Sequence, residues 1–312
     1  MARPLRITYP GAFYHVTSRG NEQNDVFKSQ RDREKFLEYL ASATERYGAV
    51  IHTYCLLSNH YHLLLETPEG NLSQIMRHVN GAYTTYFNVK RKRAGHLFQG
   101  RFKAILVEAD EYALELSRYI HLNPVRAVMV SRPEEYRWSS YNNYIGQDNA
   151  PLWLKMETIL DYFSSSAKEA RQQYRSFVED LLGKEYDSPF KNTFGAAVLG
   201  SAEFIETVTR EHLSEKEIDR TVSGIRQFKT KPEPKEILKA VAAIMGENKK
   251  LSRQVGMYLS HKYSGKKLRE IGELFGVGET AIAEARRLLS RKMETDKQLC
   301  GEVEKVKGVL KI

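Results

Sequence analysis

The chain has 312 residues, enough for two domains of ordinary size, and its 41% hydrophobic and 28% charged residues exclude a disordered protein. A formal net charge of +9 indicates a polyanionic partner. With two distant cysteines, no signal peptide and no apolar run near the roughly 18 residues of a membrane span, the sequence fits a protein of the reducing cytoplasm.

The first part of the chain predicts strands and helices in the order β-α-β-β-α-β-α. Residues 11–19 should form a strand, and Ser29 should cap a helix that Gly48 ends. The remaining elements of this part are two strands around a turn at residues 58–59, a helix at 72–93, a strand at 96–107 with a bend at Gly100, and a helix from Asp110. That last helix should end near Asn123, because Pro124 disfavours helical geometry in the residue before it.

The first six elements are the pattern of a ferredoxin-like split βαβ sandwich, an antiparallel sheet with helices on one face and the other face free for a ligand. The expected fold class is therefore α+β, with an extra helix after the sheet. Residues 146–230 are expected to be a mainly helical connecting region, and residues 228–235, with two prolines, a linker. Residues 231–312 predict an all-α helix-turn-helix domain after a first domain of residues 1–145.

A strand that follows the turn at residues 58–59 carries His60 and His62. Side chains alternate along a strand, so both imidazoles should lie on one face, about 7 Å apart. Two such groups on a rigid strand make half of a metal site. The alternative is a pair of polar residues on a solvated strand face, and His15 on the first strand is either a neighbour of this site or, in the simpler interpretation, a structural histidine.

The helix after Asp110 supplies side chains that would complete such a site. Tyr119 and Asn123 are four residues apart and share a helix face, whereas His121 lies about 200° from Tyr119 and should point elsewhere. His60, His62 and the Asn123 oxygen would hold a divalent cation, Mg²⁺ or Mn²⁺, and Tyr119 would be the nucleophile. The alternative for Tyr119 is an aromatic packing residue.

This combination resembles the HUH endonuclease superfamily and, within it, the REP-associated tyrosine transposases. The resemblance covers about residues 5–145 and rests on residues 14–21 (YHVTSRGN), 57–65 (LSNHYHLLL), 100–103 (GRFK) and 118–127 (RYIHLNPVRA). It implies that the tyrosine attacks a phosphodiester of single-stranded DNA, leaving a 5′-phosphotyrosine bond and a free 3′-hydroxyl, and that short palindromic hairpins are recognised.

Residues 70–107 contain no Asp or Glu, and their basic and aromatic residues are the ingredients of a single-strand binding surface. We expect DNA contacts from Arg126 and from the basic residues of this stretch, Arg77, Lys90, Arg91, Lys92, Arg93, Arg101 and Lys103. The alternatives are that the aromatic residues form the core face of a helix and that residues 90–93 are a solvated helix end.

In the C-terminal domain, residues 268–289 (LREIGELFGVGETAIAEARRLL) predict a helix-turn-helix with a glycine-containing turn. Together with residues 255–260 they resemble the DNA-binding domain of the replication initiator DnaA, without its base-reading signature at the turn. If the second helix enters a major groove, spacing makes Thr280, Glu284, Arg287 and Arg291 candidate contacts to duplex DNA. The alternative is a helical protein–protein module.

The sequence therefore predicts a metal-dependent, tyrosine-nucleophile single-strand DNA endonuclease and strand transferase. Two alternatives remain: a DNA-binding regulator that has kept the fold without cutting, and a replication or conjugation initiator of the wider superfamily. The recognised hairpin and the oligomeric state do not follow from the sequence.

Overall fold

The computed structural model describes residues 3–4, 6–185, 187–213, 222–223, 232–246, 249–264 and 266–310. The chain divides into two compact units, Met1–Phe228 and Lys229–Ile312. Residues 228–231 of the expected linker lie outside the described residues, and the helix that follows begins at Pro234.

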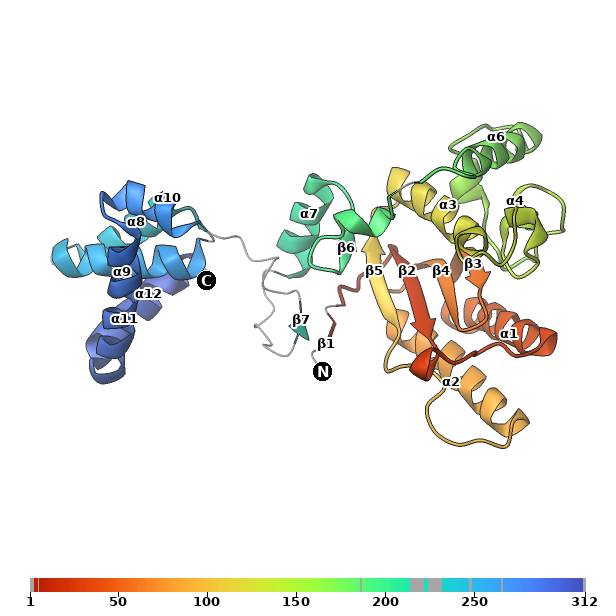
Figure 1. Cartoon of the computed structure of the whole chain (residues 1–312), viewed down its shortest axis with the longest axis horizontal. Helices are drawn as coiled ribbons and strands as arrows, with labels where there is room; N and C mark the ends of the chain where they lie inside the picture. Colours follow the sequence, from red (N-terminus) through yellow and green to blue (C-terminus); the bar gives the residue numbers. More distant parts are fainter. Residues whose placement is uncertain are drawn as a thin grey trace. The chain divides into compact units, whose positions relative to one another are not determined.

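A five-stranded sheet of order β3-β4-β2-β5-β6 forms the centre of the first unit (Figure 1). Its strands are β2 (Ala12–Arg19), β3 (Val50–Leu56), β4 (His60–Thr67), β5 (Lys103–Val107) and β6 (Val198–Leu199). The first four pair antiparallel, and β6 adds to β5 in parallel. The expected ferredoxin-like α+β class is confirmed. Two short strands outside this sheet, β1 (Arg3–Pro4) and β7 (Val222–Ser223), pair with each other in parallel.

Helices lie on both faces of the sheet. On one face are α1 (Gln30–Tyr47) and α2 (Leu72–Lys90), where Phe36 of α1 packs on Tyr61 of β4 with 4.7 Å between ring centroids. On the other face is α3 (Glu111–Arg126), whose Tyr119 ring lies 5.9 Å from the ring of His62. The expectation that this second face stays free is therefore wrong, because α3 packs against β3 and β4.

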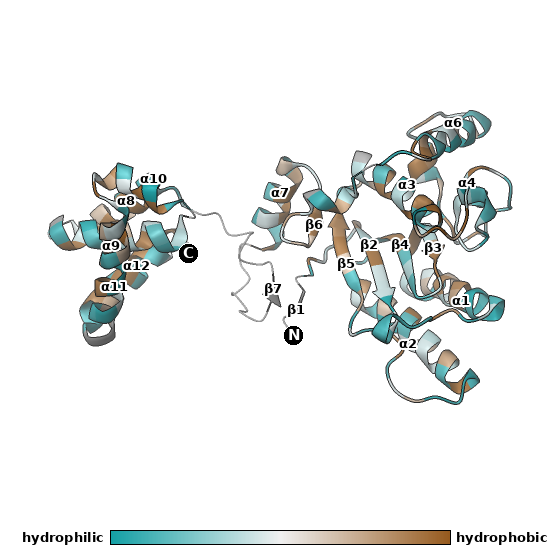
Figure 2. Ribbon diagram, in the orientation of Figure 1, coloured by the Kyte–Doolittle hydropathy of each residue, from teal (hydrophilic) through white to brown (hydrophobic). Residues whose placement is uncertain are grey.

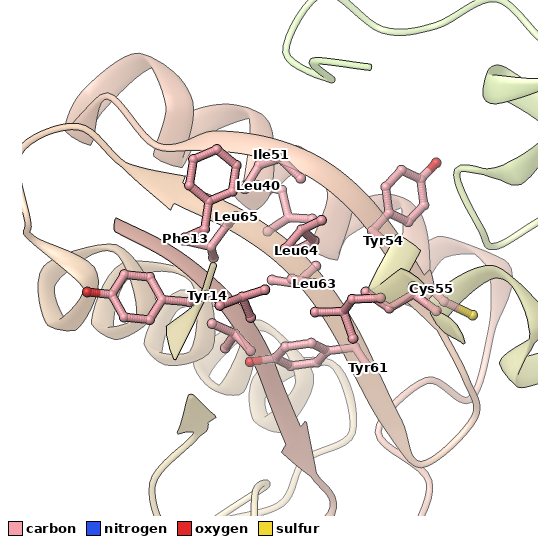
Figure 3. Close-up of a cluster of buried hydrophobic side chains, with 14 of the residues drawn as sticks. Phe13, Tyr14, Leu40, Ile51, Tyr54, Cys55, Tyr61, Leu63, Leu64 and Leu65 are labelled. Atoms are coloured by element: carbon pink, nitrogen blue, oxygen red, sulfur yellow. The ribbon is translucent and has the colours of Figure 1, made fainter. Parts of the chain in front are cut away.

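The core explains why these strands form. β4 is buried on both faces, and its alternating side chains pack against α1 and α2 on one side and α3 on the other. Figure 3 shows part of this core, a cluster that includes Phe13, Tyr14, Leu40, Ile51, Tyr54, Cys55, Tyr61, Leu63, Leu64 and Leu65. In Figure 2 the ribbon of β5 is hydrophobic, while α6 and the outer turns of α1 are largely hydrophilic.

Three element boundaries differ from the sequence-based expectation. α2 ends at Lys90, because Lys92 turns into the left-handed region at φ 49°. β5 begins only at Lys103, after an irregular segment in which Gly100 makes the expected bend at φ 65°. α3 continues through Pro124 to Arg126, so the expected end near Asn123 is wrong. Pro124 lacks only its own N–H, and the helix closes beyond it through the bond from the Ala127 N–H to the Asn123 carbonyl.

The residues after α3 form α4 (Tyr141–Tyr144), α5 (Glu157–Leu160), α6 (Ala167–Glu179) and α7 (Ala202–His212), with short 3₁₀ turns at Asn21–Gln23, Pro133–Glu135 and Pro189–Asn192 elsewhere in the unit. Several of the elements after α3, namely α5, α6 and the 3₁₀ turns at Pro133–Glu135 and Pro189–Asn192, pack against α3. Residues 146–230 were expected to be mainly helical, but within them Val198–Leu199 form β6. Tyr174 of α6 is fully buried against His121 of α3, which places α6 in the same core as the sheet.

The second unit is all-helical in its described residues, as expected. It comprises α8 (Pro234–Met245), α9 (Lys249–Tyr263), α10 (Leu268–Phe275), α11 (Glu279–Thr295) and α12 (Lys297–Leu310). α10 ends at Gly276, which adopts φ 62°, and a three-residue turn leads into α11. α12 was not predicted; its Leu299, Val303 and Val306 are buried in the core with α8 and α9. None of the helices in the described ranges is long and apolar enough to cross a membrane.

Candidate active site

β4 presents His60 and His62 on the sheet face that α3 covers. Their ring centroids are 5.0 Å apart, so the prediction that they share a face is confirmed. Cross-strand pairing places Thr17 of β2 beside His62, and Lys103 of β5 beside Thr17. Directly paired residues in an antiparallel sheet point to the same face, and Lys103 therefore lies on the histidine face.

Each histidine has one ring nitrogen engaged in a hydrogen bond. His60 Nδ1 lies 2.6 Å from Asn59 Oδ1, which can only accept, so His60 donates from Nδ1 and keeps the lone pair of Nε2. His62 Nδ1 lies 2.8 Å from His15 Nε2. His62 Nε2 is buried and has no hydrogen-bond partner among the described residues. Donation from His62 Nδ1–H to His15 Nε2 would leave the Nε2 lone pair of His62 pointing into the site.

Burial keeps all three imidazoles neutral. It lowers the pKa of His15 to about 3 and that of His60 to about 4, with smaller effects from the neighbouring charge of His60 and of Arg19 respectively. Burial, followed by the proximity of His15, His60 and Arg126, lowers the pKa of His62 well below its usual value. Neutral imidazole is the form that binds a metal ion, so these side chains need no deprotonation to act as ligands.

α3 positions Tyr119 and Asn123 opposite β4. The Tyr119 ring meets that of His62 edge-on at 5.9 Å, and the Arg126 guanidinium lies 4.8 Å from the Tyr119 ring centroid. Asn123 Nδ2 donates to the Tyr119 carbonyl at 2.8 Å, which leaves the Oδ1 atom as the acceptor end of that side chain. The structure thus brings together Tyr119, His60 and His62, and it places Asn123 one helical turn after Tyr119, bonded to the Tyr119 carbonyl. His121 points away, as expected: it is fully buried and bonded to Tyr174 and Ser140.

A phenylalanine from a distant part of the chain covers this group. Phe190, in the 3₁₀ turn Pro189–Asn192, stacks on His15 with 4.7 Å between centroids and meets the Tyr119 ring edge-on at 5.1 Å. It excludes water from one face of the His15 ring, and this burial contributes to the low pKa of His15.

The residues fit a divalent cation whose remaining ligands come from outside the protein. No three His, Cys, Asp or Glu side chains in the described part of the chain are grouped so that they could hold a metal alone. His60, His62 and Asn123 are instead two imidazoles and an amide, a neutral set. The unpartnered Nε2 of His62 is the atom that a cation would satisfy, and phosphate oxygens would supply both the missing ligands and the negative charge.

The predicted DNA contacts fall into different environments. The fully buried carboxylate of Asp32 forms ion pairs with Lys90 and with Arg91. The Asp32 oxygen lies 2.8 Å from the Lys90 Nζ atom. Lys92 and Arg93 are exposed just after α2. Arg77 of α2 and Arg101 line one cavity, and Lys103 and Arg126 lie on the α3 side of the sheet. In the second unit the exposed Thr280, Arg287 and Arg291 follow one face of α11.

Sequence reasoning underrated or missed three side chains at this site: His15, Arg19 and Phe190. His15 and Arg19 share the histidine face, since Arg19 pairs with His60 and His15 lies four residues before it on the same strand. The alternation of β2 would have revealed both once its pairing with β4 was known. No local sequence pattern marks Phe190 as a site residue, because the chain brings it to the site only where it turns back toward β6.

The stretch that carries this arrangement matches a known family. Residues 8–123 match the family described as "Transposase IS200 like". Among solved structures, one described as a REP-associated tyrosine transposase bound to a REP hairpin is similar, at 16% identity over 50% of this chain and 92% of that chain, with a TM-score of 0.42.

Proposed function

We propose that residues 8–123, which match the IS200-like transposase family, form a transposase domain, and that through Tyr119 the chain cuts and rejoins single-stranded DNA. The observation that carries the proposal is the placement of Tyr119 against the buried His62, whose Nε2 atom has no partner among the described residues. A tyrosine hydroxyl has a pKa of about 10 when free, so it is a weak nucleophile at neutral pH. It therefore requires a strongly polarised phosphate.

His60, His62 and Asn123 would hold a divalent cation, Mg²⁺ or Mn²⁺, beside the scissile phosphate. When bound, the cation would polarise the phosphate oxygens and offset the charge that builds up on them. The Tyr119 oxygen would attack the phosphorus, forming a 5′-phosphotyrosine bond while the 3′-oxygen of the preceding nucleotide leaves. The energy of the broken bond is kept in the covalent intermediate, so the strand can be rejoined to a 3′-hydroxyl.

Basic side chains around this group would position the strand. Lys103 lies two strands from His62 on the same face, and Arg126 lies over the Tyr119 ring. Both can contact phosphates next to the one attacked. Lys92 and Arg93, exposed just after α2, would contact DNA on the α1–α2 side of the sheet, whereas Lys90 and Arg91 chiefly neutralise Asp32 and would contact DNA only in addition. The sequence resemblance to REP-associated transposases makes hairpin-bearing single strands the proposed substrate.

We propose a separate task for the second unit. Its exposed Thr280, Arg287 and Arg291 on α11, after the turn at residues 276–278, suit contact with duplex DNA near the cut. Residues 1–145 would then be the catalytic part, 146–230 the connecting part and 231–312 the helix-turn-helix part, in a cytoplasmic protein.

One assay tests the proposal. The protein is incubated with hairpin-containing single-stranded oligonucleotides and Mn²⁺ or Mg²⁺, and a covalent adduct is sought on a denaturing gel. We expect an adduct with the natural sequence and none with Tyr119→Phe. Tyr112→Phe, a half-buried tyrosine of the same helix, is the matched control and should still form the adduct. Adduct formation by Tyr119→Phe would exclude Tyr119 as the nucleophile, and DNA binding with no adduct in any condition would favour a regulator that does not cut.

A further inference from the structure

A basic cavity lies on the α1–α2 side of the sheet, away from Tyr119. It has a volume of about 560 Å³, within the size range of small-ligand sites. α2 lines it with Arg77, Asn80 and Gly81, and the segment before β5 lines it with Gly100 and Arg101. Arg6, which precedes β2, completes the wall.

Three guanidinium groups meet in this cavity without a counter-charge. No carboxylate lines it, and Arg6, Arg77 and Arg101 form no ion pair with any of the described acidic residues. Burial, and then the nearby charge of Arg101, lower the pKa of Arg6. Arg6 is half-buried, while Arg77 and Arg101 are exposed. Like charges gathered around a half-buried arginine destabilise the folded protein unless an anion binds there.

Arg6 is held rigidly in position. Its guanidinium stacks 3.7 Å from the centroid of the Phe102 ring, and its NH2 group donates to the Phe102 carbonyl at 2.9 Å. The Arg6 Nε atom is buried and has no hydrogen-bond partner among the described residues. A guanidinium fixed in this way loses little side-chain entropy when it binds a phosphate.

The cavity lies directly behind the strand that carries the two histidines. Tyr61, between His60 and His62, points to the opposite face, and its hydroxyl donates to Asn80 Oδ1 at 2.7 Å. That bond occupies the oxygen of Asn80 and leaves its NH2 as a donor at the cavity wall. The cavity also lies at the His60 end of the sheet. Its lining residue Phe98 pairs with Gly20, and the next residue, Gln99, donates its N–H to the carbonyl of Arg19, which is the residue that pairs with His60.

We propose that this cavity binds a phosphodiester group of the same single-stranded DNA that Tyr119 attacks, several nucleotides from the cut, which rests on the function proposed above. The guanidinium groups of Arg6, Arg77 and Arg101 contact the phosphate oxygens, and the Asn80 NH2 contributes a neutral donor. A strand that passes over the His60 end of the sheet reaches both faces. The phosphate held behind β4 thereby fixes the register of the strand relative to Tyr119.

Gly81 offers a test that leaves the fold intact. It is exposed in the middle of α2, and a Cβ atom built there meets nothing within 4 Å. Gly81→Glu and Gly81→Lys introduce side chains of similar length and helix propensity with opposite charge.

Binding of a fluorescein-labelled single-stranded oligonucleotide is measured by anisotropy on the full chain without divalent cation. We expect Gly81→Glu to bind about tenfold or more weakly than Gly81→Lys, because a like charge near a phosphate is repelled. Equal affinities of the two variants would overturn the proposal.

Two further measurements identify the ligand. Arg77→Gln with Arg101→Gln should reduce the slope of log affinity against log salt by up to about 0.7, the value for one phosphate contact on a single strand, because both side chains contact the same phosphate. An unchanged slope would contradict the assignment. With an oligonucleotide whose linkages are uncharged methylphosphonates, the difference between Gly81→Glu and Gly81→Lys should disappear. Persistence of the difference would exclude a phosphate as the ligand.

The outcome separates this site from the catalytic one. The binding measurement requires no cleavage, so a difference between the two Gly81 variants without a covalent adduct in any variant would retain this cavity and remove the proposed nuclease activity. A Tyr119-dependent adduct with equal binding by both Gly81 variants would retain the nuclease and remove the cavity.

Discussion

His15 and His62 form a buried imidazole pair in which one side chain orients the other. The 2.8 Å bond between His15 Nε2 and His62 Nδ1 couples the tautomers of the two rings, and when His62 donates from Nδ1–H its Nε2 lone pair is free. Metal-binding histidines commonly donate their second N–H to an acceptor that fixes the ring. His15 thus has the position of an orienting residue for His62.

His15→Ala should weaken Mn²⁺ binding by about 10–100-fold, the usual effect of removing such a partner. The measurement is an electron paramagnetic resonance titration of Mn²⁺ with the variant and the natural protein. His15→Gln retains an oxygen that can accept from His62 Nδ1, and it should recover part of the affinity. If both variants melt like the natural protein and bind Mn²⁺ equally well, His15 only fills space.

At the scale of elements, α1 and α2 are joined by a buried carboxylate. Asp32 has no exposed side-chain surface and accepts hydrogen bonds from Lys90 and from the Lys28 N–H, and Arg91 pairs with it as well. Asp32→Ala should lower the free energy of unfolding by about 3 kcal/mol, near the lower end for a buried ion pair that loses one partner, because Lys90 and Arg91 keep some solvent contact. Urea unfolding of the full chain measures it, with Glu34→Ala on the exposed side of α1 as a control that should change stability little.

The Asp32 contribution should also depend on pH. Burial alone would raise the pKa of Asp32, but bonds from Lys90 and Ser29 and the charge of Arg91 outweigh burial and hold that pKa below its usual value. A carboxyl group with a lowered folded-state pKa stabilises the protein above its unfolded pKa of about 3.9 and loses that contribution as pH falls through the folded value. The stability gap between the natural protein and Asp32→Ala should therefore be constant at neutral pH and shrink in acid. A gap that widens in acid would show that Asp32 is not ionised in the fold.

The sequence predicts best the elements whose signals are local. Ser29 accepts from the Asp32 N–H and Gly48 adopts φ 62°, so both ends of α1 follow from the capping residues. The face shared by His60 and His62 follows from strand alternation alone. The path of α3 through Pro124 and the short strand β6 could not be predicted in this way, because each is fixed by packing against distant residues. For the same reason Phe190 was absent from the expected site, although its ring covers two of its members.

At the scale of the whole molecule, two units carry different proposed tasks. Arg287 and Arg291 are both exposed on α11, and Arg287 lies 3.8 Å from Glu284.

Arg287→Gln with Arg291→Gln in the full chain should weaken duplex binding and lower its salt slope by about 1.8, about 0.9 for each lost contact. The Tyr119-dependent adduct with single-stranded DNA should be unchanged. Glu284→Gln is the opposite control, since it removes a negative charge from the same face and should strengthen duplex binding. Duplex affinity insensitive to all three changes would favour a protein-binding role for the second unit.

The late position of Phe190 in the chain also bears on biosynthesis. His15 and His62 are 47 residues apart, and Phe190 joins them only after the chain has passed through α6 and turned back toward β6. Domains fold as they emerge from the ribosome, beginning at the N-terminus. A nascent chain that ends at α3 already contains Tyr119 and all three imidazoles but lacks the ring that shields His15 and Tyr119. Translation must therefore proceed well past the last catalytic residue before the pocket is enclosed, which ties the proposed DNA-cutting centre to nearly complete synthesis of the first unit.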